Sequence, residues 1–386
     1  MRYLDQEEDR GSALKRPLFI GSEIYRRSKY SGWHPLRVPR VSTVIDLSRA
    51  MGWLPREVYR TSPRAKPHLL EAWHAPDYVA ALQRVEATQA VSEEDRTRYG
   101  IGTVSNPVYP EIFRRPATAA GGSFLAGELL AQGGVVYHPA GGTHHGMPAR
   151  ANGFCFLNDP VLAMLSLRHH GVRRIVYVDI DAHHCDGVEV GFSGDPDCLM
   201  ISVHEEGLWP RTGGLEETAG GSAINLPVPR GMNDTEMELI REEVILPAVA
   251  GFGPEAIVLQ CGADAVEEDP LSHLSLSNNA HWGLVRGLMG MAPRLLVLGG
   301  GGYNPWSVGR LWTGVWATLN AIEIPDRLSE EAEAVQRGLS FEGNRRGKNP
   351  PRHWFTTLKD TPREGPVRDE VRERVRVLKR RIGAGG

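Results

Sequence analysis

Six short runs of apolar residues are spread along the chain, and within each run the apolar residues are continuous rather than alternating with polar ones. They are Leu18–Gly21, Val135–His138, Ile175–Asp181, Leu199–His204, Ile257–Cys261 and Leu295–Leu298. Continuous runs rich in Val, Ile and Leu predict strands that are covered on both faces, as in a parallel sheet.

Segments with helical spacing lie between these runs, at Ala117–Leu130, Asp159–His169, Asp234–Val249 and Asn279–Met291. Asp234 and Asn279 stand where the N-caps of two of these helices are expected. The alternation of strands and helices predicts an α/β fold with a mostly parallel sheet.

The composition is that of a globular enzyme and excludes several other classes of protein. The chain of 386 residues has 44 Lys and Arg against 47 Asp and Glu, which gives no charge excess for nucleic acid or an anionic membrane. Its apolar runs reach about ten residues, too few to span a bilayer. The start, MRYLDQEEDRGSALKRP, lacks the apolar stretch of a signal peptide. Four cysteines without a Cys-x-x-Cys pair indicate free thiols in the cytoplasm.

The composition changes after about Ile324, which predicts a main domain over 1–324 and a C-terminal arm over 325–386. Within the arm, GNRRGKNPP at 343–351 is expected on the surface. A basic helix is predicted over Val367–Ile382, with its apolar residues on one face at Val367, Val371, Val375, Leu378 and Ile382. Such a helix could bind nucleic acid or a partner. We favour a helix docked on the main domain with a solvated charged face.

Polar residues follow four of the apolar runs, where each strand is expected to end. They are His144 and His145 in GGTHHG, then Asp179, Asp181, His183, His184 and Asp186 in DIDAHHCDG, then Asp264 in QCGAD, and Tyr303 after GGGG. In an open α/β sheet the functional crevice lies outside the carboxyl ends of the strands. We therefore expect these side chains to meet at one edge of the sheet.

Three of these residues are suited to bind a metal ion. Asp181 and His183 alternate with Ala182, so both side chains can point to one side, and Asp264 can add a third ligand. Three ligands with an open position are typical of catalytic zinc, and the same set accepts iron, cobalt or manganese. Alone, Asp181 and His183 would also fit a surface cap or a buried hydrogen-bonded pair. Ligands at several strand ends favour the metal.

The His144–His145 pair and Tyr303 are candidates for catalytic roles. Asp179 and Asp186 can each orient one of the two histidines, making one a general base toward metal-bound water and the other its electrostatic partner. The alternative is an exposed pair in a glycine-rich loop. The Tyr303 hydroxyl can donate to an oxyanion, although a core tyrosine is the simpler alternative.

Two aromatic residues, Phe154 and Trp209, are candidates for pocket walls or for ordinary core packing. The glycines at Gly299–Gly302 do not have the spacing of a phosphate-binding loop.

Five segments in order resemble the histone deacetylase superfamily, and most closely its bacterial branch of acetoin utilization proteins. They are GGTHHGMPARANGFCFLND, VYVDIDAHHCDGVEVGF, SVHEEGLWPRTGG, QCGADAVEEDPLSHLSLS and LGGGGYN. The resemblance runs from about Phe19 to Leu319 and includes HPLRVPR near the start. It implies a single-domain, three-layer arginase–deacetylase fold around an eight-stranded, mostly parallel sheet, with 1–324 as the catalytic domain.

The resemblance also implies roles for individual residues. Asp181, His183 and Asp264 would hold zinc, with Fe²⁺ as an alternative in cells. His145 would be the general base and acid oriented by Asp186, His144 its companion paired with Asp179, and Tyr303 the donor that polarises the carbonyl.

Further residues are implied for substrate and for structural potassium. The substrate tunnel would be formed by Gly153, Phe154, Trp209 and Leu271, with Arg40 behind the zinc where the acetate product is released. One potassium ion would lie at Asp179, Asp181, His183, Ser202 and Val203, and a second near Phe192, Asp195 and Cys198.

The chain departs from its relatives at three positions. Ser105 stands where many carry an aspartate that binds the substrate backbone, which weakens the case for a peptide. Arg211 replaces a glycine and puts a charge near the rim. Leu271 replaces the glutamate of polyamine-specific relatives, which argues against acetylpolyamines.

The predicted function is zinc-dependent hydrolysis of acyl-lysine in a peptide or protein, or of a small acylated amine, to free amine and acetate. One alternative is a binuclear ureohydrolase of the same architecture, which would need further metal ligands. Another is a catalytically silent module that binds acyl-lysine. No nucleic acid and no membrane is expected as a partner.

Overall fold

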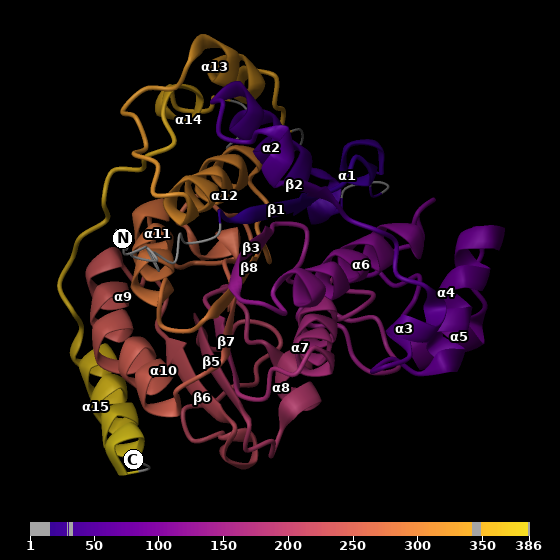
Figure 1. Cartoon of the computed structure of the whole chain (residues 1–386), viewed down its shortest axis with the longest axis horizontal. Helices are drawn as coiled ribbons and strands as arrows, with labels where there is room; N and C mark the ends of the chain where they lie inside the picture. The colour runs from indigo at the N-terminus through magenta and orange to yellow at the C-terminus, as the bar shows by residue number, and fades with distance from the viewer. Residues whose placement is uncertain (1–15, 29, 31–33, 342–348, 385–386) are drawn as a thin grey trace, which may run out of the picture.

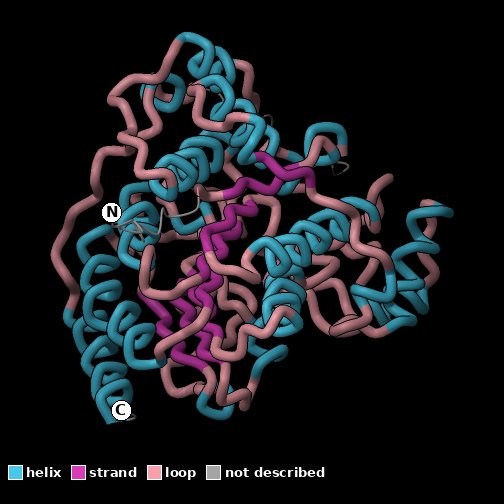
Figure 2. Tube along the Cα trace, viewed as in Figure 1, coloured by secondary structure: helices cyan, strands magenta, loops and turns pink. Residues whose placement is uncertain are grey.

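The computed structural model describes residues 16–28, 30, 34–341 and 349–384. Its centre is one sheet, whose strands are magenta in Figure 2. The strand order is β2-β1-β3-β8-β7-β4-β5-β6, and neighbouring strands pair in parallel. The strands are β1 Leu18–Gly21, β2 Tyr59–Thr61, β3 Gly134–His138, β4 Ile175–Asp179, β5 Cys198–Glu205, β6 Ala223–Val228, β7 Ala256–Gln260 and β8 Arg294–Leu298. The predicted eight-stranded α/β fold is confirmed.

Helices cover both faces of this sheet. They are α1 Ile24–Arg27, α2 Val41–Ala50, α3 Pro67–Leu70, α4 Pro76–Thr88, α5 Glu93–Tyr99, α6 Arg114–Leu129, α7 Asp159–His169, α8 Asp186–Phe192, α9 Asp234–Ile240, α10 Leu246–Phe252, α11 Asn278–Leu288, α12 Pro305–Leu319, α13 Glu330–Arg337, α14 His353–Thr356 and α15 Asp369–Ala384. Figure 1 shows α6, α7 and α8 on one side of the sheet and α9 to α12 on the other.

Shorter helical turns complete the chain. Among the described residues, four are 3₁₀ turns, at Pro35–Arg37, Arg56–Val58, Ala219–Gly221 and Ala263–Ala265. A π-helical turn at Arg241–Ile245 joins α9 to α10, so the predicted single helix over 234–249 is interrupted.

Strand β4 shows why the apolar runs are continuous. Val176 and Val178 pack into the cluster formed with α9 to α12, whereas Ile175 and Tyr177 pack into the cluster formed with α6, α7 and α8. Successive side chains of a strand point to opposite faces, and here both faces are buried.

Two predicted N-caps are wrong by one or two positions. Asn233 caps α9 in a capping box with Glu236, and Asp234 is the first residue of the helix. The Asp234 carboxylate instead accepts from Ser277 N at 2.8 Å. Ser277 caps α11, and Asn279 lies inside the helix. The observed caps, Asn233 and Ser277, both have the extended backbone that an N-cap requires.

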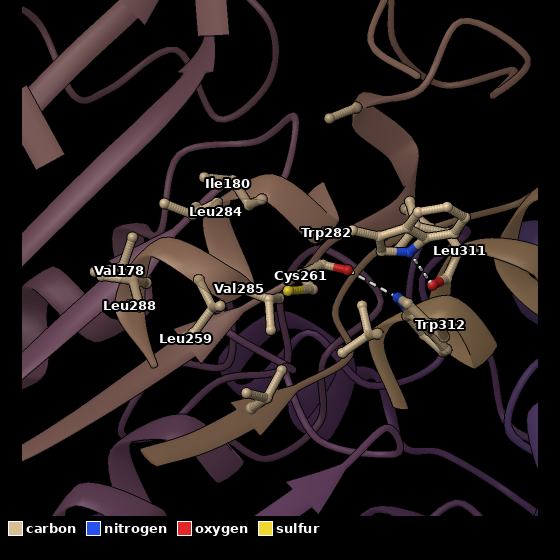
Figure 3. Packing of buried hydrophobic residues seen from close by; sticks show 14 of the residues in the cluster. Val178, Ile180, Leu259, Cys261, Trp282, Leu284, Val285, Leu288, Leu311 and Trp312 are labelled. Atoms are coloured by element: carbon tan, nitrogen blue, oxygen red, sulfur yellow. Dashed lines mark hydrogen bonds between the residues drawn. The ribbon is translucent and has the colours of Figure 1, made fainter. Parts of the chain in front are cut away.

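Helix α12 is buried along its whole length and holds the end of β7 in place. Trp312 Nε1 donates to the carbonyl of Cys261 at 2.8 Å, and Trp282 Nε1 donates to that of Leu311 at 2.9 Å (Figure 3). Both bonds satisfy a polar atom inside an apolar cluster. Because Cys261 directly follows β7, its bond to Trp312 also fixes the start of the loop that leads to Asp264.

The C-terminal helix α15 lies against the outside of this layer. Val371, Val375 and Leu378 are buried, while Val367 and Ile382 are partly buried against the same cluster. The expected boundary at 324 remains a prediction. Residues 343–348 of the expected surface arm and residues 1–15 of the N-terminal segment lie outside the described residues. No helix among the described residues is both long and apolar enough to cross a membrane.

Candidate active site

The predicted site residues come together at the carboxyl edge of the sheet. The strands β3, β8, β7 and β4 are neighbours in the sheet, so the loops that follow them are neighbours too. The loop after β3 carries the two histidines, and the loop after β8 carries Tyr303. The loop after β7 carries Asp264, and the loop after β4 carries the Asp181–His183 pair. The parallel topology therefore collects polar side chains from distant parts of the sequence.

Asp181, His183 and Asp264 form a compact group of metal-ligand atoms. His183 Nδ1 lies 3.1 Å from Asp181 Oδ1 and 3.0 Å from Asp264 Oδ2, and all three ligand atoms lie within 4.8 Å of one another. Burial and the Asp181 charge raise the pKa of Asp264 to about 6. Two buried carboxylates facing one imidazole nitrogen fit a divalent cation, which would neutralise both, and this donor set suits zinc or iron.

Backbone amides hold the carboxylates in this arrangement. Asp181 Oδ2 accepts from Gly301 N at 2.6 Å, and Asp264 Oδ1 accepts from Ala182 N at 3.0 Å. The amide of Asp181 itself donates to Asp179 Oδ1 at 2.9 Å. Each carboxylate thus has one oxygen among the ligand atoms and an amide that fixes its orientation.

Each of the two adjacent histidines is held by its own carboxylate. His144 Nδ1 lies 2.7 Å from Asp179 Oδ2, and His145 Nδ1 lies 2.6 Å from Asp186 Oδ1. A carboxylate only accepts, so Nδ1 carries the proton and Nε2 is the basic nitrogen of His145. The alternative of an exposed pair is excluded, because both rings are buried.

The surroundings separate the pKa values of these histidines. Burial, and then the neighbouring His144, lower the pKa of His145 to about 4. Burial alone would lower the pKa of His144 too, but Asp179 and Asp181 outweigh it and raise this pKa to about 9. Near neutral pH His145 is thus a neutral base beside a positively charged His144.

Tyr303 faces the same cavity as His145 and Asp181. Burial, and then the charges of Asp264 and Asp181, raise the pKa of Tyr303 well above its usual value, so its hydroxyl stays protonated and can donate. Arg40 Nη1 donates to the carbonyl of Gly300 at 2.7 Å, and its guanidinium lies 5.3 Å from the centre of the Trp312 ring.

Aromatic side chains line the approach to this cavity. The ring centres of Trp209 and His145 are 4.7 Å apart, and those of Phe154 and Tyr303 are 5.8 Å apart. A Cβ at Gly153 would lie 2.4 Å from the Trp209 ring, so a larger residue would displace this ring. Leu271 is half-buried against the cluster that contains Tyr303.

The departures from the family pattern lie at or near the surface. Ser105 and Arg211 are both exposed. His34 Nε2 lies 3.1 Å from the Ser105 carbonyl, and its ring centre is 4.7 Å from that of Phe154. His34 therefore links the tunnel wall to the Ser105 loop, a role that its place in HPLRVPR did not suggest.

The two predicted potassium sites remain predictions. Asp179 and Ser202 are paired across β4 and β5, next to Val203. Phe192 ends α8, Cys198 begins β5 and Asp195 lies between them. Asp195 N donates to the Phe192 carbonyl and Cys198 N to the Asp195 carbonyl, both at 3.2 Å.

Asp269 was not predicted as part of the site. It is buried, and its carboxylate accepts from the amides of Tyr303 and Leu271. Burial, and then the charge of Asp264, raise the pKa of Asp269 to about 8. Its sequence, AVEEDP, reads as a charged surface loop, and only the tertiary contacts indicate otherwise.

The chain resembles known proteins over most of its length. Residues 34–319 match the family model described as the histone deacetylase domain. The chain is 35% identical over 308 residues to histone deacetylase 9 of Arabidopsis thaliana, covering 77% of this chain and 71% of the relative. It is 30% identical over 324 residues to acetoin utilization protein AcuC of Bacillus subtilis, covering 80% and 84%.

Solved structures give the same picture. A crystal structure of a histone deacetylase homologue from Aquifex aeolicus superposes with a TM-score of 0.89 at 35% identity, covering 95% of this chain and all of the other. A homologue complexed with SAHA superposes with a TM-score of 0.86 at 34% identity, with the same coverage.

Proposed function

The chain belongs to the histone deacetylase family, and we propose that it is a zinc-dependent deacetylase that hydrolyses an N-acyl-lysine side chain or another acylated amine to amine and acetate. The observation that carries the proposal is the arrangement around one cavity. His145 and Tyr303 face it together with Asp181, whose carboxylate belongs to the metal-ligand group.

Asp181, His183 and Asp264 are the residues that would hold the metal. Zinc bound there would supply Lewis acidity, polarising the amide carbonyl and lowering the pKa of the attacking water. Fe²⁺ suits the same ligands and is the alternative.

His145 has the properties of the general base. Its Nδ1 proton is held by Asp186, so Nε2 is free to take the proton of the water as that water attacks the carbonyl carbon. Its low pKa keeps it neutral before the reaction. The same Nε2 then returns the proton to the amine nitrogen as the C–N bond breaks.

Tyr303 stabilises the charge that develops on the carbonyl oxygen. Its hydroxyl stays protonated in the buried site and donates to the oxyanion. The protonated His144 beside His145 adds positive charge to the same region.

The aromatic approach suits an unbranched apolar stem such as that of lysine. Phe154, Trp209 and Leu271 present apolar surface, and Trp209 is 42% exposed. The exposed Ser105 offers no carboxylate for a peptide backbone, which keeps a small acylated amine as an alternative substrate.

The rival functions have weaker support. A binuclear ureohydrolase would need more ligands here, but among the described residues the only other group that could hold a metal is Glu268, His353 and Asp360. His144 Nδ1 is already held by Asp179. A silent binding module would not require the pairing of His145 with Asp186.

The proposal is tested by amine release from an acetyl-lysine peptide and from a small acetylated amine. Native protein, His145→Ala and the matched control His169→Ala, an exposed histidine, are each assayed metal-free and with zinc. Zinc-dependent turnover by the native and His169→Ala proteins, lost in His145→Ala, is expected. Zinc binding without turnover of either substrate would contradict the proposal and favour the binding module.

A further inference from the structure

The buried carboxylate of Asp269 joins two walls of the active site. Its Oδ2 accepts from Tyr303 N at 2.7 Å, and its Oδ1 accepts from Leu271 N at 2.9 Å. The residue is 1% exposed. Burying a carboxylate is unfavourable, so its retention in a cleft points to a role beyond filling space.

The chain before Tyr303 is intrinsically pliable, because it consists of glycines. Gly300 and Gly302 have φ values of 124° and 136°, a region that side chains rarely allow. Gly301 is fixed by its bond to Asp181, and Asn304 is fixed as the N-cap of α12. Between them, Tyr303 N donates to Asp269 Oδ2, and this hydrogen bond fixes the Tyr303 backbone.

A second bond reinforces this connection. Asn304 Nδ2 donates to the carbonyl of Glu268 at 3.2 Å. The loop that carries Asp269 is therefore joined to the glycine loop at two consecutive residues, which limits sliding of one loop along the other.

We propose that Asp269 is a positioning residue. It holds the Tyr303 hydroxyl in its productive position and connects the Tyr303 backbone to the tunnel wall at Leu271. The inference rests on the proposed function, because the hydroxyl matters only if it stabilises an oxyanion. Two backbone amides bound to one buried side chain, at 2.7 Å and 2.9 Å, suit a fixed placement.

Asp269→Asn and Glu268→Gln form a matched pair of substitutions. Asparagine replaces one acceptor oxygen by a donor, so one of the two amides loses its partner. Among the described residues, the Glu268 side chain pairs with Arg363 of the C-terminal segment and makes no hydrogen bond to the glycine loop. Glu268→Gln therefore shows the effect of loosening the same loop while the bond between Asp269 and Tyr303 is kept.

The first test is a double-mutant cycle with Tyr303→Phe. Asp269→Asn is expected to lower kcat about 10–100-fold, since displacements of about 1 Å at a catalytic group have costs of this size, with KM changed less than about threefold. In the Tyr303→Phe background it should lower kcat less than about threefold, because the hydroxyl is already gone. Glu268→Gln should leave kcat near native. If the kcat losses of Asp269→Asn and Tyr303→Phe instead multiply in the double mutant, the proposal is overturned.

The second test does not depend on turnover. Amide exchange in a peptide covering residues 299–306 should accelerate in Asp269→Asn but not in Glu268→Gln, and a crystal structure of Asp269→Asn should show the Tyr303 hydroxyl displaced. An unmoved Tyr303 with native exchange would overturn the inference even if the native protein deacetylated nothing. If Asp269→Asn does not fold, Asp269→Glu, which keeps the carboxyl group and moves its oxygens, is measured in both tests.

Discussion

Gly301 is the position where the smallest change should do the most damage to the metal-ligand group. A Cβ built on Gly301 would lie 2.0 Å from Asp264 Oδ2, 2.6 Å from Asp264 Cγ and 2.9 Å from Asp181 Oδ2, whereas ordinary contacts begin at 3.4 Å. Alanine at 301 therefore forces the Asp264 carboxylate or the glycine loop to move by more than about 1 Å, far beyond the ~0.2 Å tolerance of metal–ligand distances.

The expected cost follows from this displacement. Disturbing the partners that orient metal ligands typically lowers metal affinity 10–100-fold, and Gly301→Ala acts on a ligand itself. We therefore expect zinc affinity to fall at least 10–100-fold, or about 1.4–2.7 kcal/mol. Gly301 has no positive φ, so the loss would arise from the contact and not from backbone strain.

Zinc affinity is measured by competition with a chromophoric chelator, with Gly251→Ala as the control. Gly251 lies in α10 with nothing within 4 Å of a built Cβ, and alanine there should leave zinc affinity unchanged and raise the free energy of unfolding by about 1 kcal/mol. Native zinc affinity in Gly301→Ala would refute the packing of the glycine loop against the ligands.

Three further predictions concern catalysis, acid stability and the C-terminal helix. Tyr303→Phe should lower kcat about 10²–10³-fold with little change in zinc affinity, and unchanged turnover would remove its assigned role. Burial alone would raise the pKa of Glu236, but the hydrogen bonds from Arg368 outweigh it and lower this pKa below 4.5. The ion pair therefore stabilises the fold above about pH 4.5, and this stabilisation is lost as the pH falls through the folded-state pKa of Glu236. In urea unfolding at neutral pH, Glu236→Gln should have a free energy of unfolding about 1–3 kcal/mol below that of the native protein. Between about pH 5 and pH 3 the free energy of unfolding should decrease less in the variant than in the native protein. The same pH profile in both proteins would contradict this. Arg374 bonds to Glu206 and Arg381 to the Leu215 carbonyl, on either side of the Trp209 loop, so replacing both arginines by glutamine should speed amide exchange across residues 206–217. Unchanged exchange there would show that α15 does not hold this loop.

The sequence predicted the inner strands well and the outer strands poorly. The inner strands are buried on both faces and therefore appear as continuous apolar runs. Strand β2 has three residues, Tyr59–Thr61, none fully buried, and β6 contains Pro227. Both lie at the edges of the sheet, where short strands and proline are tolerated, so neither had a recognisable pattern.

The candidate site was predictable where its chemistry is local in sequence. Asp181 and His183 adjoin a strong strand, and His144 and His145 are adjacent, so their residue types and spacing indicated a metal site with paired histidines. The bonds from Tyr303 N to Asp269 and from Gly301 N to Asp181 join segments far apart in the chain. Such contacts depend on how two loops meet in space, which neither loop reveals alone.

The central claim is that one metal ion, held by Asp181, His183 and Asp264, supports deacetylation at this site. The most direct test is a titration of metal-free protein with zinc while acetate release from an acetyl-lysine peptide is followed. Turnover should rise in proportion to zinc and reach its plateau at one ion per chain, and Asp264→Asn should show no comparable rise. A plateau that requires two ions, or a chain with one tightly bound zinc and no turnover of acetyl-lysine peptide or small acetylated amine, would contradict the claim.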